Sequence, residues 1–304
     1  MLAPQGPQAR QIAELSWILF GAAAVILLLV AILVFLATVG PDAARVRLAR
    51  SSSVVVCGLA MPLVVLGAAL AYGLWLTRSV ASTSGDDAVR IEVTGEQWWW
   101  RIAYPMPGGG DVASANEIRI PLGRPVDLTL RSADVIHSFW VPNLAGKVDM
   151  IPGRTTRMRV VADRVGVFRG QCAEFCGGPH GLMAFEVVAL PPDEFDDWLL
   201  AQAADAREPS SPAGWRGKHV FLAAGCGGCH AMRGTAAVGA IGPDLTHLAS
   251  RRRIGAGTLA ASPADLVRFI TDSQHAKPGN RMPPFQVLEG DAARAIVTYL
   301  IEAH

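Results

Sequence analysis

Two long apolar runs dominate the first quarter of the chain. Residues 17–39 and 54–76 contain no charged side chain, and each reaches the roughly 20 residues that a helix needs to cross a bilayer. The segment between them carries one aspartate and three arginines, Arg45, Arg47 and Arg50. The positive-inside rule therefore places this loop in the cytoplasm, with the N-terminus and everything after Leu76 on the outer side.

A buried hairpin in a soluble protein is the alternative, which the basic loop disfavours. The first run is too long, and lacks the small-residue cleavage site, for a signal peptide.

The pattern then changes to short alternating segments over residues 88–191. These segments are rich in Val, Ile and Trp and are separated by Pro and Gly, which is typical of an antiparallel sandwich or barrel. We expect a Greek-key β domain here. Three consecutive tryptophans, residues 98–100, cannot all face one core because side chains alternate along a strand. At least one of them is expected at a surface or an interface.

Helical periodicity returns toward the C-terminus. Residues 191–206 predict a short amphipathic helix, and a polar stretch rich in Pro and Ser follows it. Two later segments begin with Ser or Asp and continue with apolar positions at helical spacing. We therefore predict four parts, which are a transmembrane hairpin (1–85), a β domain (86–205), a linker (206–213) and an all-α domain (214–304).

Composition agrees with a protein that lies partly in a membrane. The chain is 51% hydrophobic, with a mean hydropathy of +0.32. Its net charge is +1, from 27 basic and 26 acidic residues, so nothing points to nucleic acid as a partner. Cys57 lies alone in an apolar run and is expected to be a small packing residue. The other four cysteines form two tight pairs, which favour metal or cofactor chemistry over a disulfide scaffold.

The first cysteine pair lies in the segment GQCAEFCGGPHGLM, residues 170–183. Cys172, Cys176, His180 and Met183 fit on one loop between strands. Two soft thiolates, an imidazole and a thioether suit copper better than zinc or magnesium. A disulfide and a zinc site are the less favoured alternatives. His137, in an alternating segment upstream, is a candidate for a further ligand.

The second pair lies in CGGCH, residues 226–230, which is the attachment pattern of haem c. Cys226 and Cys229 would form the two thioethers, and His230 would be the proximal iron ligand. The segments GAIGPDLTHL and RMPPF follow in the order found in class I cytochromes c. This resemblance implies that the carbonyl of Pro243 accepts a hydrogen bond from the proximal histidine and that Met282 is the distal ligand. His247 and His275 are competing distal ligands.

The segments SADVIHSFWVP, GKVDMIPGR and GQCAEFCGGPH resemble, almost word for word, subunit II of haem–copper cytochrome c oxidases. That family has a two-helix hairpin and a cupredoxin-like domain that holds a dinuclear copper centre, CuA. By position, the resemblance implies that Trp98 lies between the copper centre and the electron donor. It implies that Glu174 also faces a Mg²⁺ site shared with subunit I. The implied copper ligands are His137, Cys172, the backbone carbonyl of Glu174, Cys176, His180 and Met183.

With the haem domain included, the chain is similar to the subunit II of caa3-type oxidases. The resemblance implies that electrons pass from an external donor, such as cytochrome c, through haem c and CuA to haem a of subunit I. Oxygen reduction at haem a3 and CuB would occur in that partner, beside subunit III. The implied location is a bacterial inner membrane, with both redox domains on the periplasmic side, where haem c is attached. One departure is Val55, which stands about where many relatives carry a glutamate that admits protons.

Two other functions remain open from the sequence. The chain could be the CuA subunit of a nitric oxide reductase, because that class reuses the same scaffold, or a stand-alone membrane-anchored electron carrier. Nitrous oxide reductase shares the copper loop but lacks the hairpin, and quinol oxidases lack the copper ligands.

Overall fold

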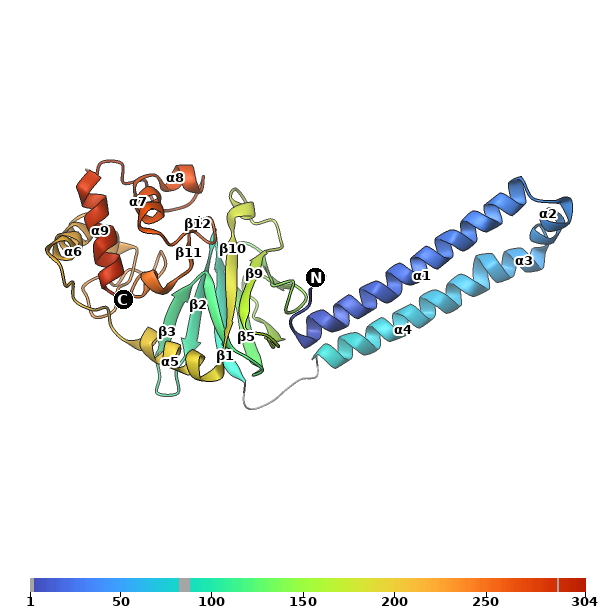
Figure 1. Cartoon of the computed structure of the whole chain (residues 1–304), viewed down its shortest axis with the longest axis horizontal. Coiled ribbons are helices and arrows are strands. Elements are labelled where there is room, and N and C mark those ends of the chain that lie inside the picture. Colours follow the sequence, from blue (N-terminus) through green and yellow to red (C-terminus); the bar gives the residue numbers. More distant parts are fainter. Residues whose placement is uncertain (1–2, 82–87, 289) are drawn as a thin grey trace. The chain divides into compact units, whose positions relative to one another are not determined.

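The computed structural model describes residues 3–81, 88–288 and 290–304. The described chain divides into two compact units (Figure 1). Residues 8–81 belong to a helical hairpin, whereas residues 3–7 and the chain from residue 88 onward form the second unit. The predicted order of a helical hairpin, a β-sandwich and a helical domain is confirmed. The predicted boundary between residues 85 and 86 lies outside the described residues.

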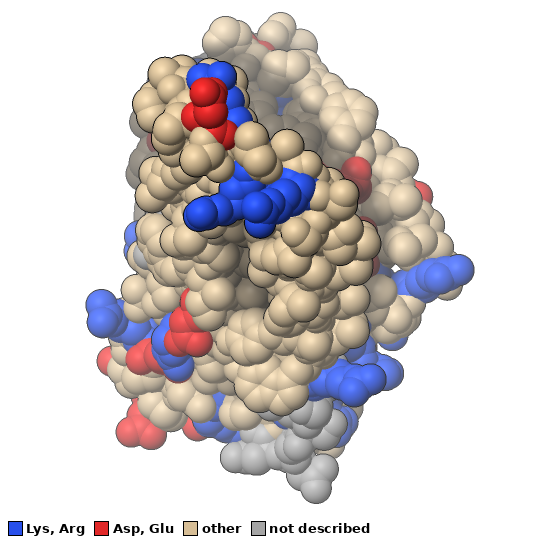
Figure 2. Space-filling view, turned by 90° about the vertical axis from the view of Figure 1, so that its right-hand side faces the viewer, with Lys and Arg blue, Asp and Glu red and all other residues tan. Residues whose placement is uncertain are grey.

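The hairpin contains two helices that are long and apolar enough to cross a membrane. The first, α1 (Pro7–Thr38), begins ten residues before the predicted start at Trp17. Those ten residues are mostly Ala, Gln, Glu and Arg, which are good helix formers, and proline is favoured in the first turn. The basic loop is itself mostly helical, with α2 (Asp42–Leu48) and α3 (Ser51–Val55). Figure 2 faces the loop end, where Lys and Arg side chains gather among uncharged residues.

The second long helix is interrupted near its start. A π-helical turn, η1 (Val56–Ala60), joins α3 to α4 (Met61–Ala81). Pro62 is the second residue of α4, and it has no N–H to offer the carbonyl of Gly58 four residues earlier. An extra residue in the turn accommodates the missing bond and the proline ring. Cys57 is exposed within this turn.

The β domain is a sandwich of two five-stranded sheets, in the orders β3-β2-β1-β5-β8 and β4-β10-β9-β6-β7. The strands are β1 (Val89–Glu96), β2 (Trp99–Pro105), β3 (Asp111–Ala115), β4 (Glu117–Pro121), β5 (Val126–Ser132), β6 (His137–Trp140), β7 (Val148–Met150), β8 (Thr156–Val160), β9 (Gly166–Cys172) and β10 (Ala184–Leu190). Two pairings, β1 with β5 and β4 with β10, are parallel. The predicted β-sandwich is confirmed, and these two pairings depart from an antiparallel pattern because chain crossovers between the sheets bring strands side by side in the same direction.

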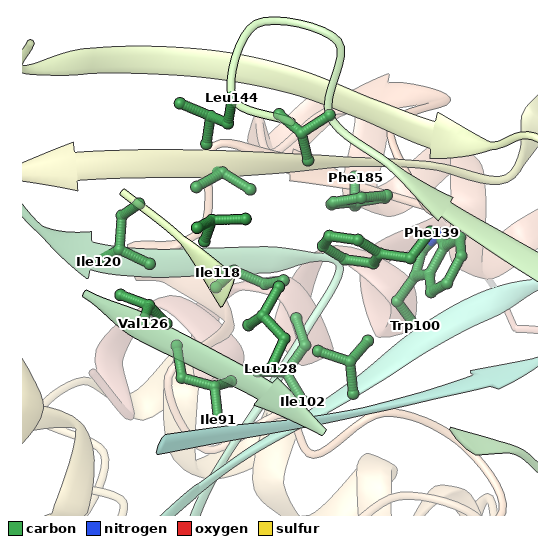
Figure 3. Packing of buried hydrophobic residues seen from close by; sticks show 14 of the residues in the cluster. Ile91, Trp100, Ile102, Ile118, Ile120, Val126, Leu128, Phe139, Leu144 and Phe185 are labelled. Carbon is green, nitrogen blue, oxygen red and sulfur yellow. The ribbon is translucent and has the colours of Figure 1, made fainter. Parts of the chain in front are cut away.

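The core lies between the two sheets. The rings of Trp100, Phe139 and Phe185 meet there (Figure 3), and the Phe139 and Phe185 centroids are 4.6 Å apart. The three tryptophans do not share one strand, because Trp98 lies in the turn between β1 and β2. Trp100 is fully buried, whereas Trp98 and Trp99 are half-buried. This agrees with the prediction that they do not all face the core.

The C-terminal domain is built around two packed helices, α6 (Pro212–Ala223) and α9 (Gly290–Glu302). The other elements are short: η3 (Cys226–Gly228), η4 (Leu248–Ser250), β11 (Arg253–Ile254), β12 (Leu259–Ala260), α7 (Pro263–Thr271) and α8 (Ser273–Ala276). Ser211 and Ser262 cap α6 and α7 through their hydroxyls, as their residue type favours. The amphipathic helix predicted before this domain is α5 (Pro192–Ala203).

The polar stretch after α5 runs along the helical domain. The backbone N–H groups of Ala206 and Arg207 donate to the carbonyls of Arg233 and Ala303, both at 3.0 Å. Ser210 and Ser211 donate their N–H groups to the carboxylate of Glu302. The stretch is therefore held at several points, although its composition predicts only a polar linker.

Candidate metal centres

Strand pairing brings the first set of predicted ligands together. Cys172 ends β9, and Met183 directly precedes β10. His137 opens β6, which pairs with β9 in a register that places Phe139 opposite Cys172. The sheet thus brings together His137 and Cys172, which are 35 residues apart along the chain.

The ligand atoms converge at one end of the sandwich. The sulfur of Cys172 lies 3.8 Å from His137 Nδ1 and 3.8 Å from the sulfur of Cys176. Cys176 Sγ is in turn 3.5 Å from His180 Nδ1 and 3.8 Å from Met183 Sδ. The thiol of Cys172 also lies 3.2 Å from the backbone oxygen of Glu174. All six predicted ligands thus lie in one cluster.

The donor set of this cluster suits copper. His137, Cys172 and Cys176 offer ligand atoms that all lie within 4.8 Å of one another, and all three side chains are buried. Thiolate, imidazole and thioether donors together select copper among the common biological metals. The carboxylate of Glu174 points elsewhere, because it lies 3.8 Å from Lys147 Nζ and is half-exposed.

Asp134 is hydrogen-bonded to His137, and sequence reasoning missed it. Its carboxylate lies 2.8 Å from His137 Nε2, so that Nδ1 faces the two sulfurs. Burial works to lower the pKa of His137, but hydrogen bonds with Cys172 and Asp134 outweigh it, and the pKa is raised. The hydrogen bond from Cys176 lowers the pKa of Cys172. A carboxylate that orients a ligating imidazole is a common feature of metal sites.

The β1–β2 turn packs against the copper loop. Trp98 Nε1 and Gln97 Nε2 both donate to the backbone oxygen of Cys176, at 3.0 Å and 2.8 Å. Gly95 lies directly against His137, because a Cβ at this glycine would stand 2.8 Å from the ring. Nothing in the local sequence indicates these roles of Gly95 and Gln97, which depend on strands that are distant along the chain.

The second set of predicted ligands lines a cavity in the helical domain. Cys226, Cys229, His230 and Met282 all lie in its wall. His230 Nδ1 is 2.7 Å from the backbone oxygen of Pro243, as the resemblance to class I cytochromes c implies. Burial lowers the pKa of His230, which favours the neutral imidazole that binds a metal.

One polar group in the cavity wall fits a bound haem. Arg251 is buried, and its Nε has no hydrogen-bond partner among the described residues. An unpaired guanidinium N–H in a buried site is costly, and the carboxylate groups of a haem would satisfy it. Together with the thiols and His230, this orphaned donor makes the cavity suitable for haem c.

The two competing distal ligands lie outside the cavity wall. His247 Nε2 lies 2.9 Å from the backbone oxygen of Ala204, and its Nδ1 lies 3.4 Å from His304 Nδ1. His275 lies in the short helix α8, where its backbone N–H donates to the carboxylate of Asp272 at 3.2 Å. In the described part of the chain neither residue belongs to the cavity wall, whereas Met282 does.

Two family models match the chain. The periplasmic domain of cytochrome C oxidase subunit II matches residues 108–190, and cytochrome c matches residues 215–303. The solved periplasmic domain of subunit II of cytochrome oxidase (CoxB) from Bradyrhizobium japonicum is 30% identical. That comparison has a TM-score of 0.36 and covers 40% of this chain and 96% of that one.

Curated relatives carry the same description. Cytochrome c oxidase subunit 2 of Alkalihalophilus pseudofirmus is 41% identical over 216 residues, which cover 71% of this chain and 61% of the relative. The protein of that name from Bacillus sp. strain PS3 is 33% identical over 213 residues, or 64% and 56% of the two chains. The chain thus spans about three-fifths of the length of these relatives. Residues 108–190 belong to the family of cytochrome c oxidase subunit II periplasmic domains, and residues 215–303 belong to the cytochrome c family.

Proposed function

We propose that this chain is the subunit through which electrons enter a haem–copper terminal oxidase. Electrons would pass from an external donor, by way of haem c and a dinuclear copper centre, to haem a of subunit I, where oxygen is reduced. The observation that carries this proposal is the presence of a copper-type donor cluster and a haem-type cavity in one compact unit. The names of the curated relatives support it.

The residues of the chain have distinct tasks in this proposal. His137, His180, Cys172 and Cys176 would hold the copper pair, with Met183 and the carbonyl of Glu174 as weaker ligands. Copper and haem c would supply one-electron chemistry when bound. Burial of the cluster excludes water from the sulfurs, and Asp134 holds the ring of His137 in place. A rigid, dry ligand set needs little rearrangement when its charge changes.

In the haem domain, Cys226 and Cys229 would attach the haem covalently. His230 and Met282 would be its axial ligands, and a His–Met pair raises the reduction potential of the iron. The carbonyl of Pro243 fixes the orientation of the His230 ring. Arg251 would bind a haem carboxylate through its unpaired N–H.

The partners and the location belong to the same proposal. The helical hairpin would anchor the chain in a bacterial inner membrane, beside subunit I and subunit III, with both redox domains on the periplasmic side. Glu174 would contribute to a Mg²⁺ site at the boundary with subunit I. A nitric oxide reductase subunit and a stand-alone carrier are not favoured, because the relatives are named as oxidase subunits.

Oxygen uptake by the intact complex tests the proposal. The chain would be purified from membranes in mild detergent, and we expect a haem a spectrum, a mixed-valence copper EPR signal and oxygen consumption with reduced cytochrome c. Substitution of Met282 should abolish the absorption band of the iron–sulfur bond. Isolation of the chain alone, without haem a or oxygen uptake, would reject the oxidase function.

A further inference from the structure

The loop that carries Met282 lies against the copper loop. Gly279 is in contact distance of Pro179, because a Cβ at Gly279 would stand 3.5 Å from the Pro179 ring. Arg281 lies 3.8 Å from the carboxylate of Asp134, which itself binds His137. Residues 277–282, named here the methionine loop, are therefore a part of the haem domain that lies directly against the copper loop and Asp134.

Most charged contacts between the two domains lie elsewhere in their interface. Glu186 forms ion pairs with Arg252 and Arg253, at 3.2 Å and 3.1 Å, and both arginines are about half-exposed. Exposed ion pairs contribute little to stability and are weakened by salt. Neither arginine belongs to the methionine loop, so these pairs do not hold that loop directly.

Lys277, the first residue of the methionine loop, makes a different kind of contact. The chain has only three lysines, and this one is 3% exposed. Its ammonium donates to the carbonyl oxygens of Leu182, at 2.9 Å, of Gly255, at 3.1 Å, and of Trp98. All three N–H donors of the ammonium are thus used.

Two of these three acceptors belong to the β domain. Leu182 directly precedes Met183, and Trp98 is the residue that contacts Cys176. A lysine that served only the fold of the haem domain would not need acceptors in the other domain. An ammonium buried to this degree is costly unless hydrogen bonds satisfy it. Carbonyl oxygens on both sides offset part of that cost only when the domains are docked.

We propose that Lys277 is a positioning residue for electron transfer between the two centres, which holds the methionine loop against Trp98 and the copper loop. This inference rests on the proposed function and adds to it a residue that is not a ligand of either centre. Without the buried ammonium, the three carbonyls lose their common donor, and the methionine loop loses its hydrogen bonds to Trp98 and Leu182.

The test uses the intact complex with the substitution Lys277→Met, compared with Lys218→Met. Methionine retains the length of the side chain and removes the donors. Lys218 lies in the same domain but pairs with Glu208, so its loss should not affect docking. Haem c would be reduced in a flash by a light-activated ruthenium compound, and transfer to copper would be followed by absorbance. We expect transfer to slow about tenfold in Lys277→Met. Hydrogen bonds to a charged group favour the bonded arrangement over the open one by at least that factor. The rate should be unchanged in Lys218→Met.

Spectra and potentials separate positioning from other effects. The haem c spectrum and the copper EPR signal of Lys277→Met should match those of the unmodified protein, which excludes misfolding of either site. Lys277→Gln, which retains two N–H donors, should recover part of the rate. An unchanged rate in Lys277→Met, or a loss of rate fully explained by shifted midpoint potentials, would overturn the inference. Absence of transfer in the unmodified complex would instead reject the proposed function.

Discussion

A single tryptophan, Trp98, is hydrogen-bonded to both the copper loop and the haem domain. Trp98 donates its indole N–H to the carbonyl of Cys176, and its own carbonyl accepts from Lys277. It also lies in the wall of the haem cavity. At the scale of one residue, Trp98 therefore lies between the copper loop and the haem cavity.

Replacing Trp98 with phenylalanine should slow electron transfer from haem c to copper. Phenylalanine cannot donate to Cys176, and a displacement of about 1 Å in such a contact can cost roughly a hundredfold, so we expect slowing by about tenfold. Flash reduction of the intact complex measures the rate. Trp215→Phe is the matched control, because that ring lies beside Lys218 on α6 and is not part of the described cavity wall. Equal rates in the two variants would remove Trp98 from the path.

His247 should make the stability of the haem domain sensitive to pH. Burial lowers its pKa below the usual 6.5, and the nearby charges of Arg233 and His304 act in the same direction. The hydrogen bond to the backbone of Ala204 and the negative charge of Asp244 oppose this shift but do not cancel it. The unfolded chain thus binds more protons than the folded one, so stability falls as pH drops from 6.5 toward the lowered pKa. The pH dependence of this stability is measured by thermal unfolding between pH 7 and about 5, followed at the haem absorbance. His247→Gln should flatten the curve; a curve of the same slope would contradict the assignment.

Residue types alone predict the metal ligands, but not the residues that hold these ligands and their loops in place. The spacing of Cys172, Cys176, His180 and Met183 places them on one loop, and the chemistry of the set indicates copper. Asp134 and Lys277 have no such signal, because their roles depend on neighbours that the fold brings from other strands. An isolated lysine between Ala276 and Pro278 predicts only an exposed charge.

At the scale of elements, the crossing of α6 and α9 depends on one glycine. A Cβ at Gly217 would stand 1.9 Å from the backbone oxygen of Ala295 and 2.9 Å from the Cβ of Tyr299. The two helices therefore touch through their backbones at this point. A close approach of this kind cannot be relieved by turning a side chain, because the nearest atom is main-chain.

The substitution Gly217→Ala should destabilise the haem domain. Overpacking costs about 1–3 kcal/mol, which outweighs the gain of up to about 1 kcal/mol in helix propensity. Denaturant unfolding followed at the haem absorbance measures the change. Arg216→Ala, one residue earlier on the exposed side of α6, should leave the midpoint nearly unchanged. A midpoint that rises in Gly217→Ala would show that the helices can separate freely.

Element types were predictable from the sequence, but several details of their arrangement were not. Apolar periodicity indicated the hairpin, the short strands and the terminal helices. The parallel pairing of β1 with β5 depends on how the chain crosses between sheets, which no local pattern records. The same holds for Trp98, whose place in a turn was hidden by the run of aromatic residues around it.

At the scale of the whole molecule, the domain order follows directly from composition. Charge-free runs, alternating segments and helical periodicity succeed one another along the chain, and each predicts its own kind of domain. The contact between the β domain and the haem domain could not be predicted, because it is made by scattered residues such as Glu117, Glu186 and Lys277. These residues become neighbours only after both domains have folded.

The stretch between α5 and α6 connects the β domain to the haem domain, and its hydrogen bonds limit how freely the two domains can move apart. A free tether would let the haem domain search for its partner, at an effective concentration set by tether length. Here Ala206, Arg207, Ser210 and Ser211 are hydrogen-bonded to the haem domain, so little search is left. Transfer between the centres should therefore be independent of solvent viscosity when glycerol is added to the intact complex. A rate that falls in proportion to viscosity would mean that the domains part and meet again in every turnover.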